Sequence, residues 1–413
     1  VATAARSGDV DPGTEGGGDP YNVRMLPRCT ARREDLRRSA LPSLLPRPAL
    51  PWPALRRPPF HRTALLLAAL SLGAGCGAVL APEAELPRAV QARPAPADPH
   101  HRLIDAVALP TGEAEFTTTR ISDGAPFDRV IPSWNVPHAG APFRVDVRAR
   151  TASGWTPWLR IGDWNVEARG SDAVTESDGA KVAVDVLDLE RPADACELRL
   201  RTDAGSAVAT SSALRFSVVL SDRSALAARV ASASAEPWPA AAPVSIDVPK
   251  RSQRVDGGDI GGRICSPTSV AMTLEHFGAG APTVELAHQI FVPHFGIFGN
   301  WNRAVQAAFD RGVPGRLVGV SSWATVARYL ERGQPLVASI RAGEGELRGA
   351  PYTKTAGHLL VVTGLGAHGA VHVNDPASKT TAAVSRVYRR EDVERVWFAN
   401  GGVAYALGPE AAE

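Results

Sequence analysis

The sequence is poor in cysteine, in lysine and in uninterrupted apolar stretches, and its charges nearly cancel. Its 413 residues include 4 cysteines, and 45 basic residues against 43 acidic ones leave a formal net charge of +2. So balanced a charge does not indicate a nucleic-acid partner, which would require a basic surface. No apolar stretch is long enough for a membrane-spanning helix, and no internal repeat indicates a solenoid.

Patterns for metal and phosphate sites are missing as well. Cys265 and His358 do not form ligand pairs of the spacing that zinc sites use. The run Gly364-Leu365-Gly366 precedes a predicted strand and not a helix, so it does not fit a phosphate-binding loop. We therefore expect neither a metal nor another cofactor.

The chain has room for two or three domains, but its first part does not have the pattern of a folded domain. Residues 1–60 combine Pro and Arg clusters with no sustained apolar period, which predicts a disordered segment or a mis-assigned leader, with translation starting at or after Met25. In residues 61–81 an arginine precedes a short apolar stretch and then small residues, the pattern of a signal peptide. We expect an exported protein, either secreted or attached to the cell envelope.

The end of this apolar stretch leaves two alternatives. Gly73-Ala74-Gly75-Cys76 resembles a lipoprotein cleavage site, so Cys76 either carries a lipid anchor or is removed by ordinary cleavage near Ala81. Residues 82–99 are rich in Ala, Pro and charge and predict a linker.

Residues 100–222 predict an antiparallel β-sandwich with an accessory role. Apolar and polar residues alternate with the period of a strand in several runs, and no helical segment separates these runs. The region also holds four tryptophans: Trp134, Trp155, Trp158 and Trp164. Tryptophans pack well in cores and also form platforms for sugar rings, so core packing and binding of cell-wall glycan both remain open.

An Ala-, Ser- and Pro-rich linker is expected at 223–244, and an α+β domain at 245–408. Helical spacing comes first and strand patterns follow. The expected helices are 266–277, 284–290, 301–310 and 323–331, and the expected strands are 335–341, 358–365, 370–374, 385–388 and 403–407.

Cys265 lies between a glycine-rich segment at 256–262, interpreted as a flexible loop, and a predicted helix. Pro267 suits the first turn of that helix and Gly278 suits its end. The thiol is then expected among unpaired backbone N–H groups at the positive end of the helix dipole, where the reactive thiolate is favoured. The alternative is a disulfide between Cys265 and Cys196.

His358 and Asp375 lie on two successive predicted strands. His358 opens an apolar strand that is expected to be buried on both faces, and Asp375 ends the strand that returns. The four-residue turn between them makes Leu365 and Ala370 partners, which places Asp375 opposite Leu360 and on the same face as His358. The carboxylate is then close enough to orient the imidazole.

The order of thiol, imidazole and carboxylate is that of a cysteine hydrolase, with Cys265, His358 and Asp375 as the predicted catalytic residues. Each residue alone also fits a structural role, and only the joint spacing indicates catalysis. Gln253, twelve residues before Cys265, is either a solvated loop residue or a donor to the oxyanion beside the Cys265 N–H.

Four segments resemble the bacterial double-glycine, or bacteriocin-processing-type, peptidase-like domains: Gln253, Cys265-Ser266-Pro267-Thr268-Ser269, Gly357-His358 and Val373-Asn374-Asp375-Pro376. These domains are papain-like cysteine peptidases, and the resemblance covers about residues 245–408. It implies Cys265 as nucleophile, His358 as general base and then acid, Asp375 as orienting group and Gln253 as oxyanion donor. The chain departs from transporter-fused members, because Ser266 stands where they carry glycine and no ATP-binding motif is found.

The sequence therefore predicts an exported cysteine peptidase that hydrolyses amide bonds of a peptide, a protein or the stem peptide of peptidoglycan. Two alternatives remain. One is a non-catalytic peptide-binding module that keeps the fold, and the other is an envelope protein that binds glycan through its tryptophan-rich domain.

Overall fold

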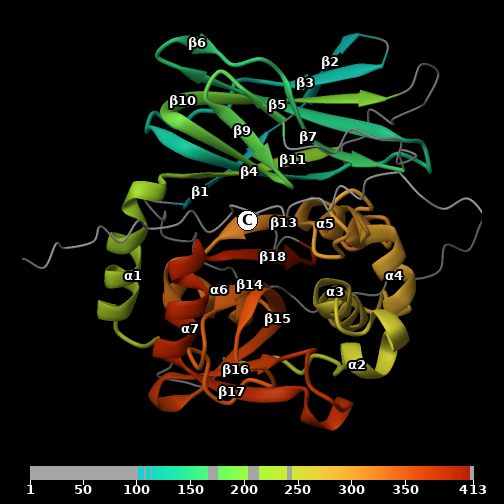
Figure 1. The fold of residues 1–413 in the computed structure, drawn as a ribbon, viewed down its shortest axis with the longest axis vertical. Helices are drawn as coiled ribbons and strands as arrows, with labels where there is room; N and C mark the ends of the chain where they lie inside the picture. Colours follow the sequence, from blue (N-terminus) through green and yellow to red (C-terminus); the bar gives the residue numbers. More distant parts are fainter. Residues whose placement is uncertain are drawn as a thin grey trace, which may run out of the picture. The chain divides into compact units, whose positions relative to one another are not determined.

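The computed structural model describes residues 101–106, 108–112, 114–165, 175–202, 214–239 and 244–409. The leader, signal peptide, lipidation site at Cys76 and first linker predicted for residues 1–99 lie outside these ranges. The described residues comprise a β-rich domain (101–221) and an α+β domain (244–408), which are joined by a partly helical segment (Figure 1). Within the described ranges, no helix has the length and apolarity needed to cross a bilayer.

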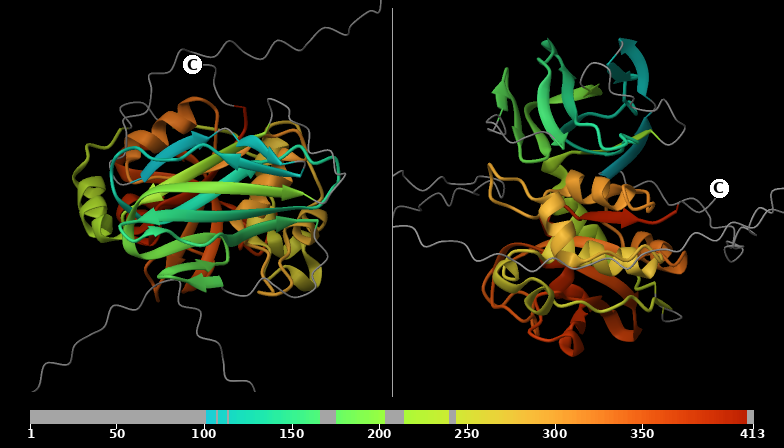
Figure 2. Two further views of the ribbon diagram at one scale, coloured as in Figure 1. Left: turned by 90° about the horizontal axis from the view of Figure 1, so that it is seen from above. Right: turned by 90° about the vertical axis from the view of Figure 1, so that its right-hand side faces the viewer.

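The strands of the β-rich domain form one antiparallel hydrogen-bonded network, which confirms the predicted antiparallel β-fold (Figure 2). They are β1 (His101–Ala106), β2 (Ala108–Gly112), β3 (Glu115–Thr118), β4 (Phe127–Asn135), β5 (Phe143–Thr151), β6 (Gly154–Trp155), β7 (Leu159–Trp164), β8 (Thr175–Ser177), β9 (Ala180–Ala183), β10 (Val186–Thr202) and β11 (Arg215–Ser221). The long strand β10 joins the network. Its first half pairs with β4 and β9, and its second half pairs with β5 and β3.

The four tryptophans of this domain divide into two pairs. Trp134 and Trp164 are 2% and 1% exposed and belong to the core. Trp155 and Trp158 are partly exposed, and the guanidinium of Arg148 lies 4.6 Å and 4.4 Å from their ring centroids, a favourable cation–π arrangement. Core packing therefore accounts for one pair, and an arginine stacks on both rings of the other.

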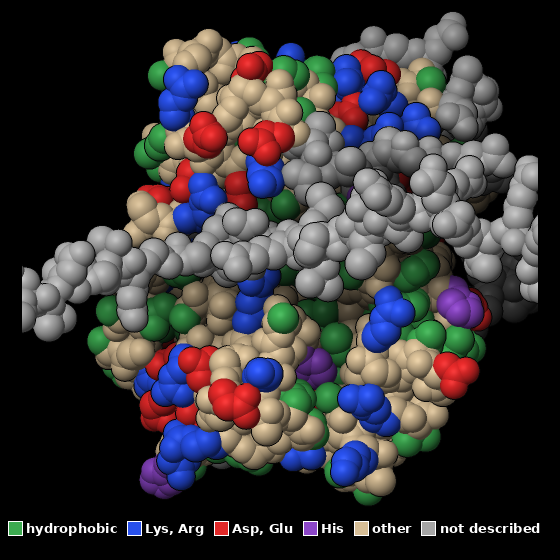
Figure 3. All heavy atoms as spheres, viewed as in Figure 1, with side chains coloured by type: hydrophobic (Ala, Val, Ile, Leu, Met, Phe, Trp, Pro, Cys, Tyr) green, Lys and Arg blue, Asp and Glu red, His purple; other side chains and the backbone are tan. Residues whose placement is uncertain are grey.

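Basic and acidic side chains of the β-rich domain are paired across neighbouring strands. Arg129 approaches Asp188 to 2.6 Å, and Arg148 approaches Glu197 to 2.5 Å. The face shown in Figure 3 likewise carries blue and red side chains interspersed among neutral ones. Opposite charges, which nearly cancel over the whole chain, are therefore also interspersed within this domain.

The α+β domain places helices on both sides of an antiparallel sheet (Figure 1). The helices are α2 (Gln253–Asp256), α3 (Cys265–His276), α4 (Thr283–Ile290), α5 (Trp301–Phe309), α6 (Trp323–Glu331) and α7 (Arg390–Val396). The strands are β12 (Val244–Ser245), β13 (Gly315–Gly319), β14 (Leu336–Ala342), β15 (Thr355–Leu365), β16 (Ala370–Asn374), β17 (Ser385–Arg389) and β18 (Val403–Leu407). The sheet order is β13-β18-β14-β15-β16-β17, with β12 beside β15.

Strand β15 is buried on both faces, as its unbroken apolar sequence predicted. Leu359 and Val361 join the hydrophobic cluster that contains α3, whereas Leu360 and Val362 join the cluster that contains α6 and α7. Successive side chains of a strand point to opposite faces, so β15 lies between the two helical layers. The α+β fold class is confirmed, and β13 and α7 are elements that the sequence patterns did not predict.

The segment predicted as a linker at 223–244 is partly helical and packs on the α+β domain. It contains α1 (Leu226–Ala235), whose alanine-rich sequence has high helix propensity. Arg390 of α7 donates to the carbonyl oxygens of Ser234 and Glu236 at 3.2 Å and 2.9 Å, and so satisfies carbonyls that the helix end leaves unpaired.

A buried carboxylate joins this segment to two helices of the α+β domain. Glu394 is 4% exposed and accepts hydrogen bonds from Ser234 Oγ at 2.8 Å, Trp323 Nε1 at 2.6 Å and Arg390 Nε at 2.6 Å. Because α1, α6 and α7 each supply one of these donors, Glu394 fixes their relative positions.

Replacing Glu394 by alanine should lower the free energy of unfolding by about 3 kcal/mol, because Arg390 and the indole N–H of Trp323 lose their buried partner. Denaturant unfolding followed by tryptophan fluorescence measures the change. Glu391→Ala, on the exposed face of α7, is the matched control and should change stability by less than about 0.5 kcal/mol. Equal effects of the two substitutions would show that Glu394 does not stabilise the packing of α1, α6 and α7.

Candidate active site

Cys265 is the first residue of α3, and its thiol is partly exposed. The thiol interacts with the side chain of His358 and with the backbone N–H groups of Ser266 and Leu359. Burial acts to raise the pKa of Cys265, but the charge and hydrogen bond of His358 and the two N–H groups outweigh it and lower the pKa. The setting therefore favours the thiolate, as the predicted helix start implied.

The second cysteine of the described ranges is unconnected to this site. Cys196 lies within β10 and is completely buried, and both Cys196 and Cys265 are free thiols. The alternative of a disulfide between them is wrong.

His358 lies on β15 and is 6% exposed. Its Nε2 is 2.8 Å from Asp375 Oδ1, so the contact with Cys265 falls to the other ring nitrogen, Nδ1. Burial acts to lower the pKa of His358, but the charges of Asp375 and Cys265 and the hydrogen bonds to both raise it to about 10. The imidazole is thus held in its protonated form beside a thiol that readily loses its proton.

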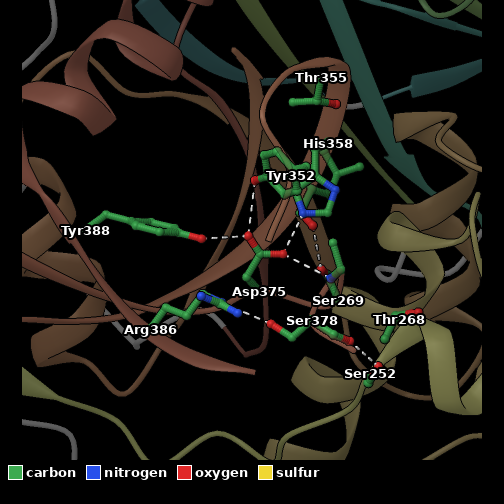
Figure 4. A network of polar contacts seen from close by, with 12 residues as sticks. Ser252, Thr268, Ser269, Tyr352, Thr355, His358, Asp375, Ser378, Arg386 and Tyr388 are labelled. Atoms are coloured by element: carbon green, nitrogen blue, oxygen red, sulfur yellow. Dashed lines mark hydrogen bonds and ion pairs between the residues drawn. The ribbon is translucent and has the colours of Figure 1, made fainter. Parts of the chain in front are cut away.

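Asp375 is completely buried, and four donors converge on its carboxylate (Figure 4). Besides His358, they are Ala377 N at 3.0 Å on Oδ1, and the hydroxyls of Tyr352 and Tyr388 at 3.1 Å and 2.8 Å on Oδ2. Burial acts to raise the pKa of Asp375, but the charge of His358 and these hydrogen bonds outweigh it and lower the pKa. Asp375 therefore stays ionised opposite the imidazole.

The two tyrosines are functional candidates that the sequence reasoning missed. Burial, followed by the charge of Asp375, raises the pKa of both Tyr352 and Tyr388, so each remains a phenol that can donate to the carboxylate. The ring of Tyr352 also meets the imidazole of His358 edge to face, with centroids 4.9 Å apart. Tyr388 lies in a strand that was predicted, but Tyr352 comes from the loop between β14 and β15, where the sequence has no distinguishing pattern.

The register of the β15–β16 hairpin explains why His358 and Asp375 meet. The predicted pair of Leu365 and Ala370 is wrong by one residue, since Leu365 pairs with Val371. An irregularity between Val362 and Gly364 restores the predicted register, because Val361 pairs with Asn374. Continuing one residue further places Asp375 beside Leu360, where the sequence put it.

Helix α3 is fastened to β15 next to the two reacting groups. Ser269 Oγ donates to the carbonyl oxygen of Leu359 at 3.2 Å, one residue from His358. The hydroxyls of Thr268 and Thr273 donate to carbonyls one turn back in the helix, at 2.7 Å and 3.0 Å. Because these hydroxyls have hydrogen-bond partners, their burial leaves no hydroxyl unpaired. The helix that carries Cys265 is buried on nearly all sides.

Gln253 is not the solvated loop residue of the alternative interpretation. It is 3% exposed, it begins α2, and its backbone N–H donates to the carbonyl oxygen of Pro376 at 2.9 Å, directly after Asp375. Within the described residues its Oε1 is buried without a hydrogen-bond partner. This oxygen is an acceptor, so it can receive a hydrogen bond from a ligand.

Two glycines of the segment before Cys265 are closely packed. A Cβ on Gly257 would lie 2.5 Å from Ile264 Cδ1 and 2.7 Å from the carbonyl oxygen of Gln253. On Gly261 it would lie 2.6 Å from that same oxygen. These glycines therefore allow the Gln253 turn to pack against Ile264, the residue before Cys265.

The structure thus connects all four residues predicted for the site. Gln253 is bonded to the segment after Asp375, Asp375 to His358, and His358 to Cys265. No group of His, Cys, Asp or Glu side chains suited to a metal ion occurs in the described ranges.

Comparisons with known proteins agree with this arrangement. Residues 245–405 match the Peptidase C39 like family, and residues 82–221 match the Peptidase C39 N-terminal domain. The domain at 245–405 belongs to the Peptidase C39 like family. This confirms the resemblance to papain-like double-glycine peptidases, and membership suggests activity as a cysteine-type peptidase. No match to a curated protein was found.

Replacing Asp375 by asparagine should move the thiolate of this C39-like site to higher pH. The substitution removes the charge that raises the pKa of His358, so the imidazolium that stabilises the thiolate is lost and the thiol pKa rises. We expect the midpoint of the pH dependence of Cys265 alkylation to increase by about one unit or more. Tyr388→Phe retains the charge and should cause a smaller shift in the same direction. An unchanged midpoint in Asp375→Asn would mean that the carboxylate does not act on the thiol.

Proposed function

We propose that the protein is a cysteine peptidase that cleaves amide bonds with Cys265, His358 and Asp375 as its catalytic residues. The observation that carries the proposal is the 2.8 Å contact between His358 Nε2 and buried Asp375, made while the same imidazole interacts with the Cys265 thiol. If these three residues only stabilised the fold, a thiol at the start of a helix beside a protonated imidazole would not be required. The family match supports the same activity.

In the proposed mechanism, the Cys265 thiolate attacks the carbonyl carbon of the scissile amide and forms a C–S bond. The tetrahedral intermediate collapses as the imidazolium of His358 gives its proton to the leaving amine. The neutral imidazole then removes a proton from water, which hydrolyses the thioester and releases the carboxylic acid. Asp375 keeps the proton on Nε2 throughout, so that Nδ1 is the atom that exchanges protons with the reacting groups.

Two donors are proposed for the oxyanion of the intermediate. The backbone N–H of Cys265 has no acceptor within its own helix because it lies in the first turn. The side-chain amide of Gln253 is the second donor, supported by its burial and by the glycine packing that holds its turn against Ile264. Such donors contribute about 3 kcal/mol each to transition-state stabilisation.

The proposed substrate is a peptide bond outside the cytoplasm, in a protein or in the stem peptide of peptidoglycan. Support for the location comes from the signal-peptide pattern at 61–81. Binding of cell-wall glycan by the β-rich domain remains a hypothesis only for Trp155 and Trp158, because Trp134 and Trp164 are in the core.

Incubation with purified peptidoglycan and with a peptide library, followed by mass spectrometry, tests the proposal. Wild-type protein should release new amino and carboxyl termini, and Cys265→Ala should release none. The rate should fall below the lowered pKa of the thiol, where the nucleophile is protonated, and above the raised pKa of His358, where the acid is lost.

Gln253→Ala should reduce kcat by roughly a hundredfold and leave alkylation of Cys265 largely unchanged, because the amide acts only on the oxyanion. Identical products from wild type and Cys265→Ala on every substrate would contradict hydrolysis by this site and favour a peptide-binding role.

A further inference from the structure

The turn between β9 and β10 of the β-rich domain carries a buried carboxyl into the α+β domain. Asp185 is 4% exposed, and its Oδ2 accepts a hydrogen bond from the backbone N–H of Trp301 at 2.6 Å. Trp301 is the first residue of α5, whose N-terminal N–H groups lack partners within the helix. Asp185 therefore binds the first N–H of a helix of the other domain, and Asn300 caps the same helix by accepting from Arg303 N.

The turn that presents Asp185 has an unfavourable backbone conformation. Val184 has φ of 62°, and Asp185 N donates to the carbonyl oxygen of Ala183 at 2.9 Å, which closes a three-residue turn around the valine. A β-branched residue rarely adopts positive φ, and this type of turn is rare and strained. Such conformations persist where their surroundings enforce them and occur preferentially at functional sites.

Helix α5 lies between the β-rich domain and the helix of Cys265. Gln306 of α5 bonds to both the backbone N–H and the carbonyl oxygen of Val136, each at 3.0 Å. One continuous hydrophobic cluster contains Val136 of the β-rich domain, Ala304 of α5 and Val270 of α3. A shift of α5 would therefore be transmitted to α3.

Tyr405 belongs to the same hydrophobic cluster and adjoins the site. This tyrosine is completely buried, and its hydroxyl is 3.0 Å from Ser266 Oγ. Burial is the main cause that raises the pKa of Tyr405, and the charges of Asp185 and Cys265 add to it. Ser266 in turn gives its backbone N–H to the thiol of Cys265.

We infer that Asp185 is a positioning residue for the Cys265 nucleophile, and that the β-rich domain completes the active site by fixing α5 and the Tyr405–Ser266 pair behind it. This inference rests on the proposed function. Asp185 does not touch the thiol, and it acts through the start of α5, which packs in the same hydrophobic cluster as α3 and Tyr405.

The chemistry of Asp185 suggests a matched pair of variants. Burial raises its pKa to about 7 against the opposing hydrogen bond from Trp301 N, so the carboxyl is partly neutral at physiological pH. Asparagine has the same shape and keeps an acceptor for the Trp301 N–H, whereas alanine removes the acceptor and leaves a cavity. Asp185→Asn should therefore preserve the positioning of Cys265 that Asp185→Ala loses.

The test measures alkylation of Cys265 by iodoacetamide against pH in the full chain, which requires no knowledge of the substrate. Asp185→Ala should slow alkylation at neutral pH by about tenfold and move its midpoint to higher pH, the size of effect expected from losing a buried hydrogen bond. Asp185→Asn should remain within about twofold of wild type. Gln306→Ala removes other interdomain bonds of the same helix but keeps the acceptor at the helix start, so it should lower the melting temperature and move the midpoint clearly less than Asp185→Ala does.

The outcomes separate this inference from the proposed function. If wild-type Cys265 is alkylated only near the ordinary thiol pKa, the proposed function fails. If wild-type Cys265 is reactive at low pH and Asp185→Ala has the same pH midpoint, Asp185 is a structural cap and the inference fails. Equal shifts of the midpoint in Asp185→Ala and Gln306→Ala would also overturn it, because general loosening of the interface would then explain both. Circular dichroism confirms that each variant is folded.

Discussion

The buried contact between Asp375 and His358 is the interaction on which the rest of this structure depends. A carboxylate with no exposed surface would ordinarily take up a proton, because burial disfavours its charge. Here an imidazolium, two phenols and a backbone N–H all donate to it and hold it ionised. That fixed negative charge keeps His358 protonated, and the imidazolium in turn stabilises the thiolate of Cys265. Removing the Asp375 carboxylate would therefore weaken both the protonation of His358 and the stabilisation of the Cys265 thiolate.

Precise placement of these groups requires a rigid surrounding, and the two-layer packing of β15 provides it. Helices α3 and α6 cover opposite faces of the strand that carries His358, and Ser269 fastens α3 to that strand beside the site. The β-rich domain contributes from the other side of α5, where Asp185 accepts a hydrogen bond from Trp301 N and the N–H of Val136 donates to Gln306. Cys265 thus lies on a helix that is supported by both domains, an arrangement that the proposed catalysis requires.

Much of the α+β domain could be predicted from sequence because its patterns are local. The apolar run after His358 indicated a strand buried on both faces, and hairpin geometry placed Asp375 opposite Leu360 even though the turn register was wrong by one residue. Contacts between distant segments could not be predicted. Nothing in the sequence shows that Tyr352 bonds to Asp375, that Asp185 reaches Trp301, or that Gly257 and Gly261 are closely packed. Helix α7 was missed because it follows β17 directly, with no turn residue between them.

The central claim is that Cys265 and His358 form a thiolate–imidazolium pair in the resting protein. Titration of the ultraviolet absorbance of the thiolate, with Cys265→Ser as the blank, measures this pair directly. The account predicts a thiolate signal that appears well below the ordinary thiol pKa in wild-type protein and that moves up toward that value in His358→Ala. A wild-type thiol that titrates in its ordinary range, with no change in His358→Ala, would contradict it.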